Sequence, residues 1–213
     1  MRALPIIAID GPAAAGKGTL ARRLARELGF DYLDTGLIYR AVGMKLARAG
    51  QDPSAVEPAE HTARTLAPTD LDAPDLRIDE AAQAASKVAV IPGVRAALLD
   101  FQRRFASHPP GGAGAVLDGR DIGTVVCPDA SVKLFVTASL EKRAERRLKE
   151  LQEKGLEAIH GTVLADMRER DDRDKNRSVA PLIPAEDAVV LDTSDLDADQ
   201  AYAVALDLVR SKQ

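Results

Sequence analysis

The sequence predicts one α/β domain with a mostly parallel central sheet and helices packed on its faces. Two observations indicate this class: short apolar runs alternate with helical segments along the 213 residues, and several of those runs end in an aspartate. A third is a Gly-rich turn between the first run and the first helix. With 46% hydrophobic and 29% charged residues, the chain can bury one sizeable core and still carry a mobile appendage.

The first half of the chain begins with a clear strand–helix pair. Ile6–Asp10 is expected as a strand because four apolar residues precede an aspartate. A helix is expected over Thr19–Leu28 and ends at Gly29, since glycine readily adopts the left-handed cap conformation. The other elements expected here are an extended piece at Asp31–Asp34, helices over Leu37–Ala49 (ended by Gly50 and Pro53), Ala55–Leu66, 79–90 and, after a break at Pro92-Gly93, Val94–Ala106, and a loop over His108–Gly114.

The second half continues the alternation. The apolar run Ala115–Leu117 is expected as a buried strand that ends at Asp118. Ser139 is expected to cap a heavily charged helix that runs to about Lys154. The remaining elements are strands at Val132–Val136 and Ala188–Leu191 and helices over Thr162–Arg173 and Asp197–Ser211, the last with Asp195 or Asp197 near its N-cap.

Composition excludes several classes of partner. The net charge of −4 gives no general attraction to nucleic acid or to a membrane surface, and 3% aromatic residues argue against base-stacking platforms. No apolar run reaches the roughly 18 residues of a membrane span, and the first strand begins too early for a secretory signal. The single cysteine, Cys127, fits a reducing cytoplasm and is expected as a packed thiol rather than a nucleophile.

The most informative stretch is the turn after the first strand. It reads Gly11-Pro12-Ala13-Ala14-Ala15-Gly16-Lys17-Gly18-Thr19. A strand, a Gly-rich turn carrying a lysine and then a helix is an arrangement that cradles phosphates, because the turn and the helix N-terminus present N–H groups to an anion. Lys17 can reach phosphate oxygens and the Thr19 hydroxyl can hold Mg²⁺. The alternative is a Gly/Ala-rich connection without a ligand.

The position of the hydroxyl group after Lys17 indicates which class of phosphate-binding protein the turn resembles. In the usual pattern Ser or Thr follows the lysine directly, whereas here Gly18 follows it and the hydroxyl comes at Thr19. This form, GKGT, is typical of nucleoside monophosphate kinases.

Aspartates at strand ends supply further candidates, since ligands bind at the carboxyl ends of parallel strands. Asp118 could bind Mg²⁺, and Arg120 would point into the same cleft as a phosphate ligand. The alternative for Asp118 is a side chain that caps a turn. At the end of the second strand, Thr35 could receive a phosphate, but on its own it is better explained as the cap of the next helix.

The charged run 168–177 allows two interpretations. One is a solvated helix with pairs such as Arg170–Asp174 and Arg173–Arg177 on one face. The other is a mobile lid whose arginines surround a transferring phosphate and exclude water. The three histidines, at 61, 108 and 160, have no metal-ligand spacing.

Several stretches together resemble the bacterial cytidylate kinases. They follow the family's order across nearly the whole chain and read IDGPAAAGKGTLAR, LDTGLIYRA, QAASKVA, VRAALLDFQR, LDGRDIGTVVCPDA, LQEKG and RDDRDKNRSVAPL. The loop is shared with all nucleoside monophosphate kinases, while DGRDIGTVV and RDDRDKNR are far more selective. The resemblance implies a three-layer P-loop kinase fold, favours the lid interpretation, and implies phosphoryl transfer from ATP to CMP or dCMP.

The resemblance also implies roles for single residues. Gly11 to Thr19 would hold ATP, and Lys17, Arg120, Arg173 and Arg177 would be the catalytic cations. Residues that match the acceptor site are Thr35, Arg40 and Arg120 for the monophosphate, Ser86, Arg95 and Asp121 for cytosine, Arg170 and Asp174 near the ribose, and Arg177 on the phosphate. Asp121 can accept from the exocyclic amine of cytosine, a group that uracil lacks.

The resemblance divides the single domain into three parts. They are a core (1–35, 107–150 and 186–213), a monophosphate-binding segment (36–106) and a lid (about 155–182). Two features depart from the family: Ala13-Ala14 stands where Ser-Gly is frequent, and the segment between Arg40 and Ser86 is short. Competing hypotheses are a P-loop regulatory switch, for which the guanine-reading Asn-Lys-x-Asp is missing, and a kinase for another small acceptor. Nothing in the sequence demands more than a monomer.

Overall fold

The computed structural model describes residues 4–212 and contains a five-stranded sheet with the strand order β2-β3-β1-β4-β5. All four neighbouring pairs are parallel, which confirms the predicted class. The strands are β1 (Ile6–Asp10), β2 (Asp31–Asp34), β3 (Ala115–Gly119), β4 (Val132–Thr137) and β5 (Val189–Asp192). Residues 1–3 and 213, which the predicted core includes, lie outside the described residues.

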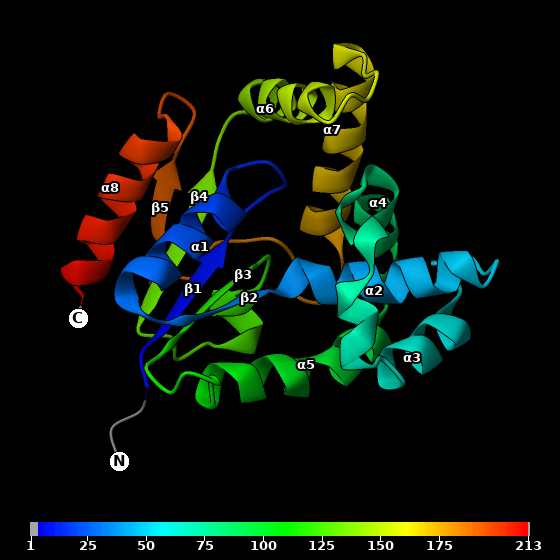
Figure 1. Cartoon of the computed structure of the whole chain (residues 1–213), viewed down its shortest axis with the longest axis horizontal. Helices are drawn as coiled ribbons and strands as arrows, with labels where there is room; N and C mark the ends of the chain where they lie inside the picture. Colours follow the sequence, from blue (N-terminus) through cyan, green and yellow to red (C-terminus); the bar gives the residue numbers. More distant parts are fainter. Residues whose placement is uncertain (1–3, 213) are drawn as a thin grey trace.

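The helices surround this sheet (Figure 1). Helices α1 and α8 cover one face and α5 packs on the other. Helices α2 to α4 form a group beyond the β2 edge, and α6 and α7 stand together at the end toward which the strands point. The bounds are α1 (Lys17–Leu28), α2 (Thr35–Arg48), α3 (Val56–Arg64), η1 (Pro68–Asp72), η2 (Pro74–Arg77), α4 (Asp79–Val88), α5 (Pro92–Ser107), η3 (Ile122–Val126), α6 (Leu140–Glu153), α7 (His160–Asn176) and α8 (Ala198–Arg210).

The core has two sides because side chains alternate along each strand. Ile7 and Ile9 of β1 face α1 and α8, where they join a cluster that includes Leu24 and Val209. Ala8 faces the other way and packs with residues of α5, β3 and η3. The near-continuous apolar runs of β1, β3 and β4 are therefore strands that are covered on both faces, whereas Val190 of β5 is exposed.

Four helices, α1, α2, α5 and α7, start two residues before the predicted start. The predicted break at Pro92-Gly93 is the first turn of α5, and α7 begins at His160 instead of Thr162. Helix α1 begins at Lys17, two residues before the expected Thr19. Helix α2 begins at Thr35 because Asp34 is its N-cap, and the Asp34 carboxylate accepts a hydrogen bond from the Leu37 N–H at 3.2 Å. The interpretation of Thr35 as the cap is wrong: its hydroxyl instead donates to the backbone carbonyl of Asp118 at 2.8 Å.

Helices α2 and α4 approach each other closely at Gly43. A Cβ atom added to Gly43 would lie 2.6 Å from Cβ and 2.9 Å from the carbonyl carbon of Ala84. This approach places α4, and with it Ser86, beside the end of the sheet.

Gly43→Ala is expected to push the two helices apart and to lower the free energy of unfolding by about 1–3 kcal/mol, as overpacking does. Urea denaturation measures this change. Gly161→Ala is the matched control, because an added Cβ at Gly161 meets nothing within 4 Å. Equal stability changes in the two variants would contradict the close packing.

Candidate nucleotide site

The loop between β1 and α1 is shaped by its backbone. Gly11 has φ +144°, and a Cβ there would lie 1.9 Å from the Val136 carbonyl oxygen, so only glycine fits. Gly16 at φ +91° turns the chain into α1, whose first residue is Lys17. The helix N-terminus, with its unpaired N–H groups, therefore opens at the loop.

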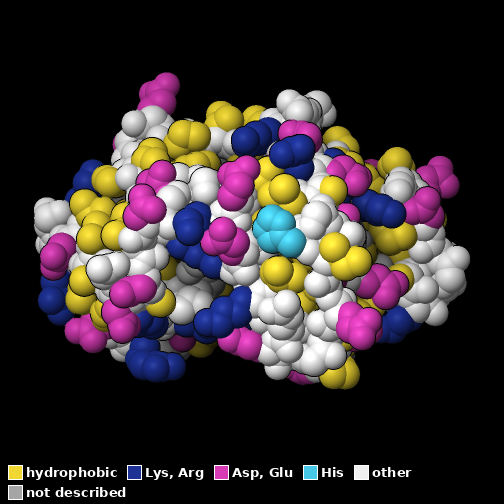
Figure 2. Space-filling view, turned by 90° about the horizontal axis from the view of Figure 1, so that it is seen from above, with side chains coloured by type: hydrophobic (Ala, Val, Ile, Leu, Met, Phe, Trp, Pro, Cys, Tyr) yellow, Lys and Arg dark blue, Asp and Glu magenta, His cyan; other side chains and the backbone are white. Residues whose placement is uncertain are grey.

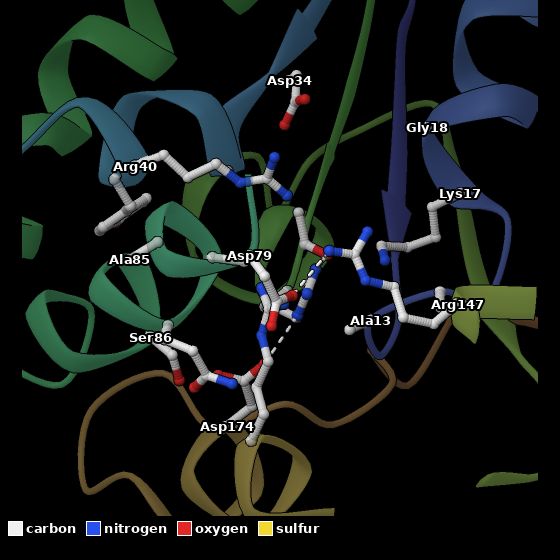
Figure 3. A pocket seen from close by; sticks show the side chains of 18 of the residues that line it. Ala13, Lys17, Gly18, Asp34, Arg40, Asp79, Ala85, Ser86, Arg147 and Asp174 are labelled. Carbon is white, nitrogen blue, oxygen red and sulfur yellow. Dashed lines mark hydrogen bonds and ion pairs between the residues drawn. The ribbon is translucent and has the colours of Figure 1, made fainter. Parts of the chain in front are cut away.

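The loop borders a cavity of about 550 Å³ at the carboxyl end of the sheet. Figure 3 shows Lys17, Arg40 and Asp174 pointing into it from different sides, namely from α1, α2 and α7. Most of the predicted site residues line this cavity: Ala13, Ala14, Gly16, Lys17, Gly18, Thr19, Thr35, Arg40, Ser86, Arg95, Asp118, Arg120, Asp121, Arg170, Asp174 and Arg177.

Four predicted residues lie outside the lining. Gly11 packs against Val136, while the carbonyls of Pro12 and Ala15 accept hydrogen bonds from Lys17 (2.7 Å) and Thr193 (3.2 Å). These three residues shape the loop. Arg173 points toward α4, where its guanidinium donates to Ser86 Oγ at 3.2 Å and to Gln83 Oε1 at 2.6 Å.

Within the described residues, Lys17, Arg40 and Arg170 line the cavity without forming an ion pair, and Arg120 lies close to Lys17 and Arg170. Burial, with Arg120 close by, lowers the pKa of Lys17 to about 7 and that of Arg170 to about 10. Burial also lowers the pKa of Arg40. Among residues 4–212, Arg170 Nε is a buried nitrogen with no hydrogen-bond partner. Such an arrangement is costly when empty and fits a ligand with several negative charges.

Asp118 lies at the end of β3 opposite this cluster. Its Oδ1 accepts a hydrogen bond from the Tyr32 hydroxyl at 2.9 Å, so the carboxylate does not cap the following turn as the alternative supposed. Oδ2 faces Gly18, where an added Cβ would stand 3.5 Å away. Burial, with Asp34 nearby, raises the pKa of Asp118 to about 6.

Asp121 holds two arginines at the deep end of the cavity. Arg95 pairs with Asp121 Oδ2, and Arg177 Nη2 lies 3.4 Å from Oδ1. All three side chains are at most 8% exposed, so the group is shielded from water. It joins α5, the segment after β3 and the end of α7 at one point.

Three residues of the charged run 168–177 line the cavity: Arg170, Asp174 and Arg177. Asp174 Oδ2 accepts from Arg120 Nε at 2.9 Å, and Arg120 with Arg170 holds the pKa of Asp174 below its usual value despite burial. The solvated-helix interpretation is therefore wrong for Arg170, Asp174 and Arg177, which point inward; only Arg173–Glu169 forms an i,i+4 pair as that interpretation supposed.

Some lining residues escaped the sequence analysis. Arg147 of α6 reaches across the cavity mouth and donates to Asp79 of α4 at 2.7 Å (Figure 3). Gln83 and Arg77 line the same mouth. The sequence around Arg147 does not distinguish it from a surface residue, because it lies in a helix whose charge pattern is that of any solvated face.

Asp10 anchors the segment that carries Asp121. Its carboxylate accepts hydrogen bonds from the N–H groups of Ile122 and Gly123, each at 2.7 Å. Burial raises the pKa of Asp10 to about 6 even though these hydrogen bonds oppose the shift.

The raised pKa of Asp10 predicts how the stability of the fold depends on pH. The folded chain holds the Asp10 proton more tightly than the unfolded chain, so ionising Asp10 costs folding free energy as pH rises through that window. Relative to Asp10→Asn, the wild type should lose about 1 kcal/mol of unfolding free energy between about pH 5 and pH 7. Urea titrations at the two pH values measure this, and a pH-independent difference would contradict it.

Comparison with known proteins shows the family of the chain. The family model described as Cytidylate kinase matches residues 7–211. The chain belongs to the cytidylate kinase family. A protein named Cytidylate kinase from Paramagnetospirillum magneticum is 83% identical over 98% of this chain and 99% of its own length. Another, from Rhodospirillum rubrum, is 62% identical over 97% and 98%.

Solved structures support the fold of this cytidylate kinase family member. A putative kinase from Chloroflexus aurantiacus matches with a TM-score of 0.52 at 13% identity and covers 100% of both chains. An uncharacterized protein from Eubacterium ventriosum matches with a TM-score of 0.56 at 15% identity, over 98% of this chain and 99% of that one. At these identities the likeness concerns the fold alone.

Two further features bear on the sequence predictions. Within residues 4–212, no helix combines the length and the apolar character that crossing a bilayer requires. Cys127 is buried, and burial raises the pKa of its thiol to about 11, in line with a packed thiol.

Proposed function

We propose that the chain transfers the γ-phosphoryl group of ATP to CMP or dCMP, forming ADP and CDP or dCDP in pyrimidine nucleotide metabolism. The observation that carries this proposal is the cluster of Lys17, Arg120 and Arg170 at one cavity, where burial and then the like charge of Arg120 lower the pKa values of Lys17 and Arg170. A single monophosphate does not match so many cations, whereas a triphosphate and an acceptor phosphate together do.

The donor half is the loop 11–19. Its N–H groups and the N-terminus of α1 face the cavity, and Lys17 would leave the Pro12 carbonyl for the phosphates of ATP. That exchange gains charge compensation for a buried ammonium group.

The acceptor half lies between α2, α4 and the segment after β3. Thr35, Arg40 and Arg120 would hold the phosphate of CMP, and Arg170 with Asp174 would lie at the ribose. Asp121, held by Arg95 and Arg177, would accept from the exocyclic amine of cytosine, with Ser86 beside it.

A magnesium ion fits the residues present. No group of three or more His, Cys, Asp or Glu in the described part of the chain could hold a metal alone. Asp118 Oδ2 faces the space beside Gly18, and Thr19 lies next to it in the lining. Mg²⁺ commonly takes one or two protein oxygens together with phosphates and water, so Asp118 and Thr19 would hold the ion that ATP brings. The ion would neutralise charge on the phosphates.

The chemistry needs no covalent intermediate with the protein. The residues hold the donor and acceptor in line, and the cations offset the charge that builds up on the transferred group. Arg120, which already contacts Asp174 of α7, would join acceptor binding to closure of α7. Arg173 and Arg177, both on that closing arm, remain candidates for stabilising the transition state, and closure would keep water from the γ-phosphoryl group.

The proposal also includes the division of the domain, its oligomeric state and its location. The division into a core, a segment at 36–106 and a lid at about 155–182 is proposed, as are a monomeric state and a cytoplasmic location. Figure 2 shows acidic and basic side chains mixed over the face above the sheet, which fits small-molecule partners better than a nucleic acid.

An assay of ADP release with ATP and a panel of monophosphates tests the proposal. CMP and dCMP should stimulate ADP release strongly and UMP weakly, because uracil lacks the amine that Asp121 would bind. Release that another acceptor stimulates more than CMP does would favour a kinase for a different small molecule. Release that is insensitive to every acceptor would contradict a kinase of either kind.

A further inference from the structure

The loop 11–19 contacts helices α6 and α7 through two of its residues, Ala13 and Ala14, at the positions where the sequence departs from the family. Arg143, in the first turn of α6, donates from Nη1 to the Ala13 carbonyl at 3.3 Å. Ala14 packs at the edge of an apolar cluster formed by α6 and α7, with Ala144 and Met167 among its members. These contacts attach the loop to the two helices, and Arg143 itself lies outside the cavity lining.

Arg143 is tied to α7 by a buried ion pair. Its Nη1 and Nη2 lie 3.2 Å and 2.6 Å from the two carboxylate oxygens of Asp171, and Nε donates to the Ala138 carbonyl at 3.0 Å. The side chains of Arg143 and Asp171 are 5% and 8% exposed. One planar guanidinium therefore joins the base of α6, helix α7 and the loop backbone, a geometry that lysine cannot reproduce.

The conformation of Ala14 shows that the loop needs this support. Ala14 has φ +56°, a left-handed conformation that is unfavourable for a residue with a Cβ. The methyl group that makes this conformation costly is the same group that contacts the cluster of α6 and α7. Packing of the methyl and the hydrogen bond to Ala13 thus both favour a backbone arrangement that the loop alone would avoid.

Helix α7 carries cavity residues on both sides of Asp171 in the sequence. Arg170 precedes it and Asp174 follows one turn later, and both line the cavity while Asp171 is held by Arg143. The ion pair therefore sets how α7 is rotated about its axis relative to the loop.

We infer that Arg143 and Asp171 are positioning residues that fix the loop 11–19 and helix α7 in one arrangement, with Ala14 as the apolar part of the same contact. This inference rests on the proposed function and deepens it, because it assigns residues outside the cavity to ATP binding and water exclusion. The contact should keep the loop N–H groups aimed at the phosphates and keep α7 over them.

Two variants test the contact. Asp171→Asn removes the negative charge of the pair, and Arg143→Lys keeps the positive charge but loses the planar guanidinium that contacts both Asp171 and Ala13. Asp172→Asn, an exposed aspartate one residue along α7, is the matched control. The measured quantities are KM for ATP, KM for CMP, and the ratio of ADP release without CMP to ADP release with CMP.

Asp171→Asn and Arg143→Lys should raise KM for ATP roughly tenfold, because a misplaced loop weakens the donor site. They should also raise KM for CMP, because α7 carries Arg170 and Asp174 into the cavity. Both variants should raise the ratio of CMP-independent to CMP-dependent ADP release several-fold, since water then replaces CMP as acceptor more often. The ratio does not depend on how much enzyme is folded, so a loss of stability alone cannot change it.

Variants that match Asp172→Asn in the ratio and in both KM values would overturn the inference, even if their melting temperatures fall. Should the wild type show no CMP-dependent release, the proposed function fails, and hydrogen exchange of the loop amides still decides the inference. Without nucleotide, exchange in the loop should be faster in Asp171→Asn and in Arg143→Lys than in Asp172→Asn; equal exchange would contradict the contact.

Discussion

Lys17→Ala is expected to lower kcat/KM by about a thousandfold, on the scale of a lost electrostatic group at a transferring phosphate. Lys17 is buried at the end of the loop, and its neighbours Arg120 and Arg170 repel it when no ligand is bound. With ATP in place the same ammonium would contact the phosphates, so its contribution is larger in the reacting complex than in the free chain.

The fold should survive this substitution. Removing a buried charge that burial and two arginines already destabilise is expected to leave the melting temperature unchanged or slightly raised. Steady-state kinetics and thermal denaturation together check both parts. Lys149→Ala, at a lysine whose side chain is 78% exposed on α6, should change neither. A Lys17→Ala variant with near-normal turnover would contradict the assignment of the loop to the donor.

Asp121→Asn is expected to have the second large effect, on stability as well as on activity. Asp121 pairs with the buried Arg95 and Arg177, and the neutral amide would leave both guanidinium groups without a counter-charge. Breaking a buried pair in this way should lower the free energy of unfolding by about 3 kcal/mol. The fall in kcat/KM for CMP should be about a hundredfold, because the amide nitrogen cannot accept from cytosine.

The preference between CMP and UMP separates the two roles of Asp121. An asparagine can donate as well as accept, so the variant should lose preference for CMP over UMP in addition to losing activity. Competition between CMP and UMP in one assay measures the preference, and urea denaturation measures stability. Asp129→Asn, an exposed aspartate after the same segment, is the control. An unchanged preference for CMP over UMP in Asp121→Asn would contradict the role of Asp121 in recognising cytosine.

The fold could be predicted from the sequence because its signals are local. Strands covered on both faces read as apolar runs, and Gly29 and Asp197 mark helix ends by their own chemistry, so those boundaries were confirmed within about two residues. The start of α2 was misplaced because Asp34 and Thr35 are both good caps, and only the tertiary contact between Thr35 and Asp118 decides between them.

The candidate site also contains residues that the sequence indicates and residues that it does not. The loop 11–19 and Asp118 were found because strand ends and Gly-rich turns have sequence signatures. The inward direction of Arg170 and Asp174 could not be read from a run whose charge pattern also fits a solvated helix. Contacts such as Arg147–Asp79 and Arg143–Asp171 join residues 68 and 28 positions apart, and nothing in the local sequence specifies them.

Transfer of label from ATP to a monophosphate tests the two-substrate cleft most directly. ATP radiolabelled in its γ-phosphoryl group is incubated with the wild-type chain, Mg²⁺ and CMP, and the products are separated. The label should move to CDP in proportion to the ADP formed, and Lys17→Ala should abolish the transfer. Label that appears as inorganic phosphate at the same rate with and without CMP would contradict the cleft proposed here.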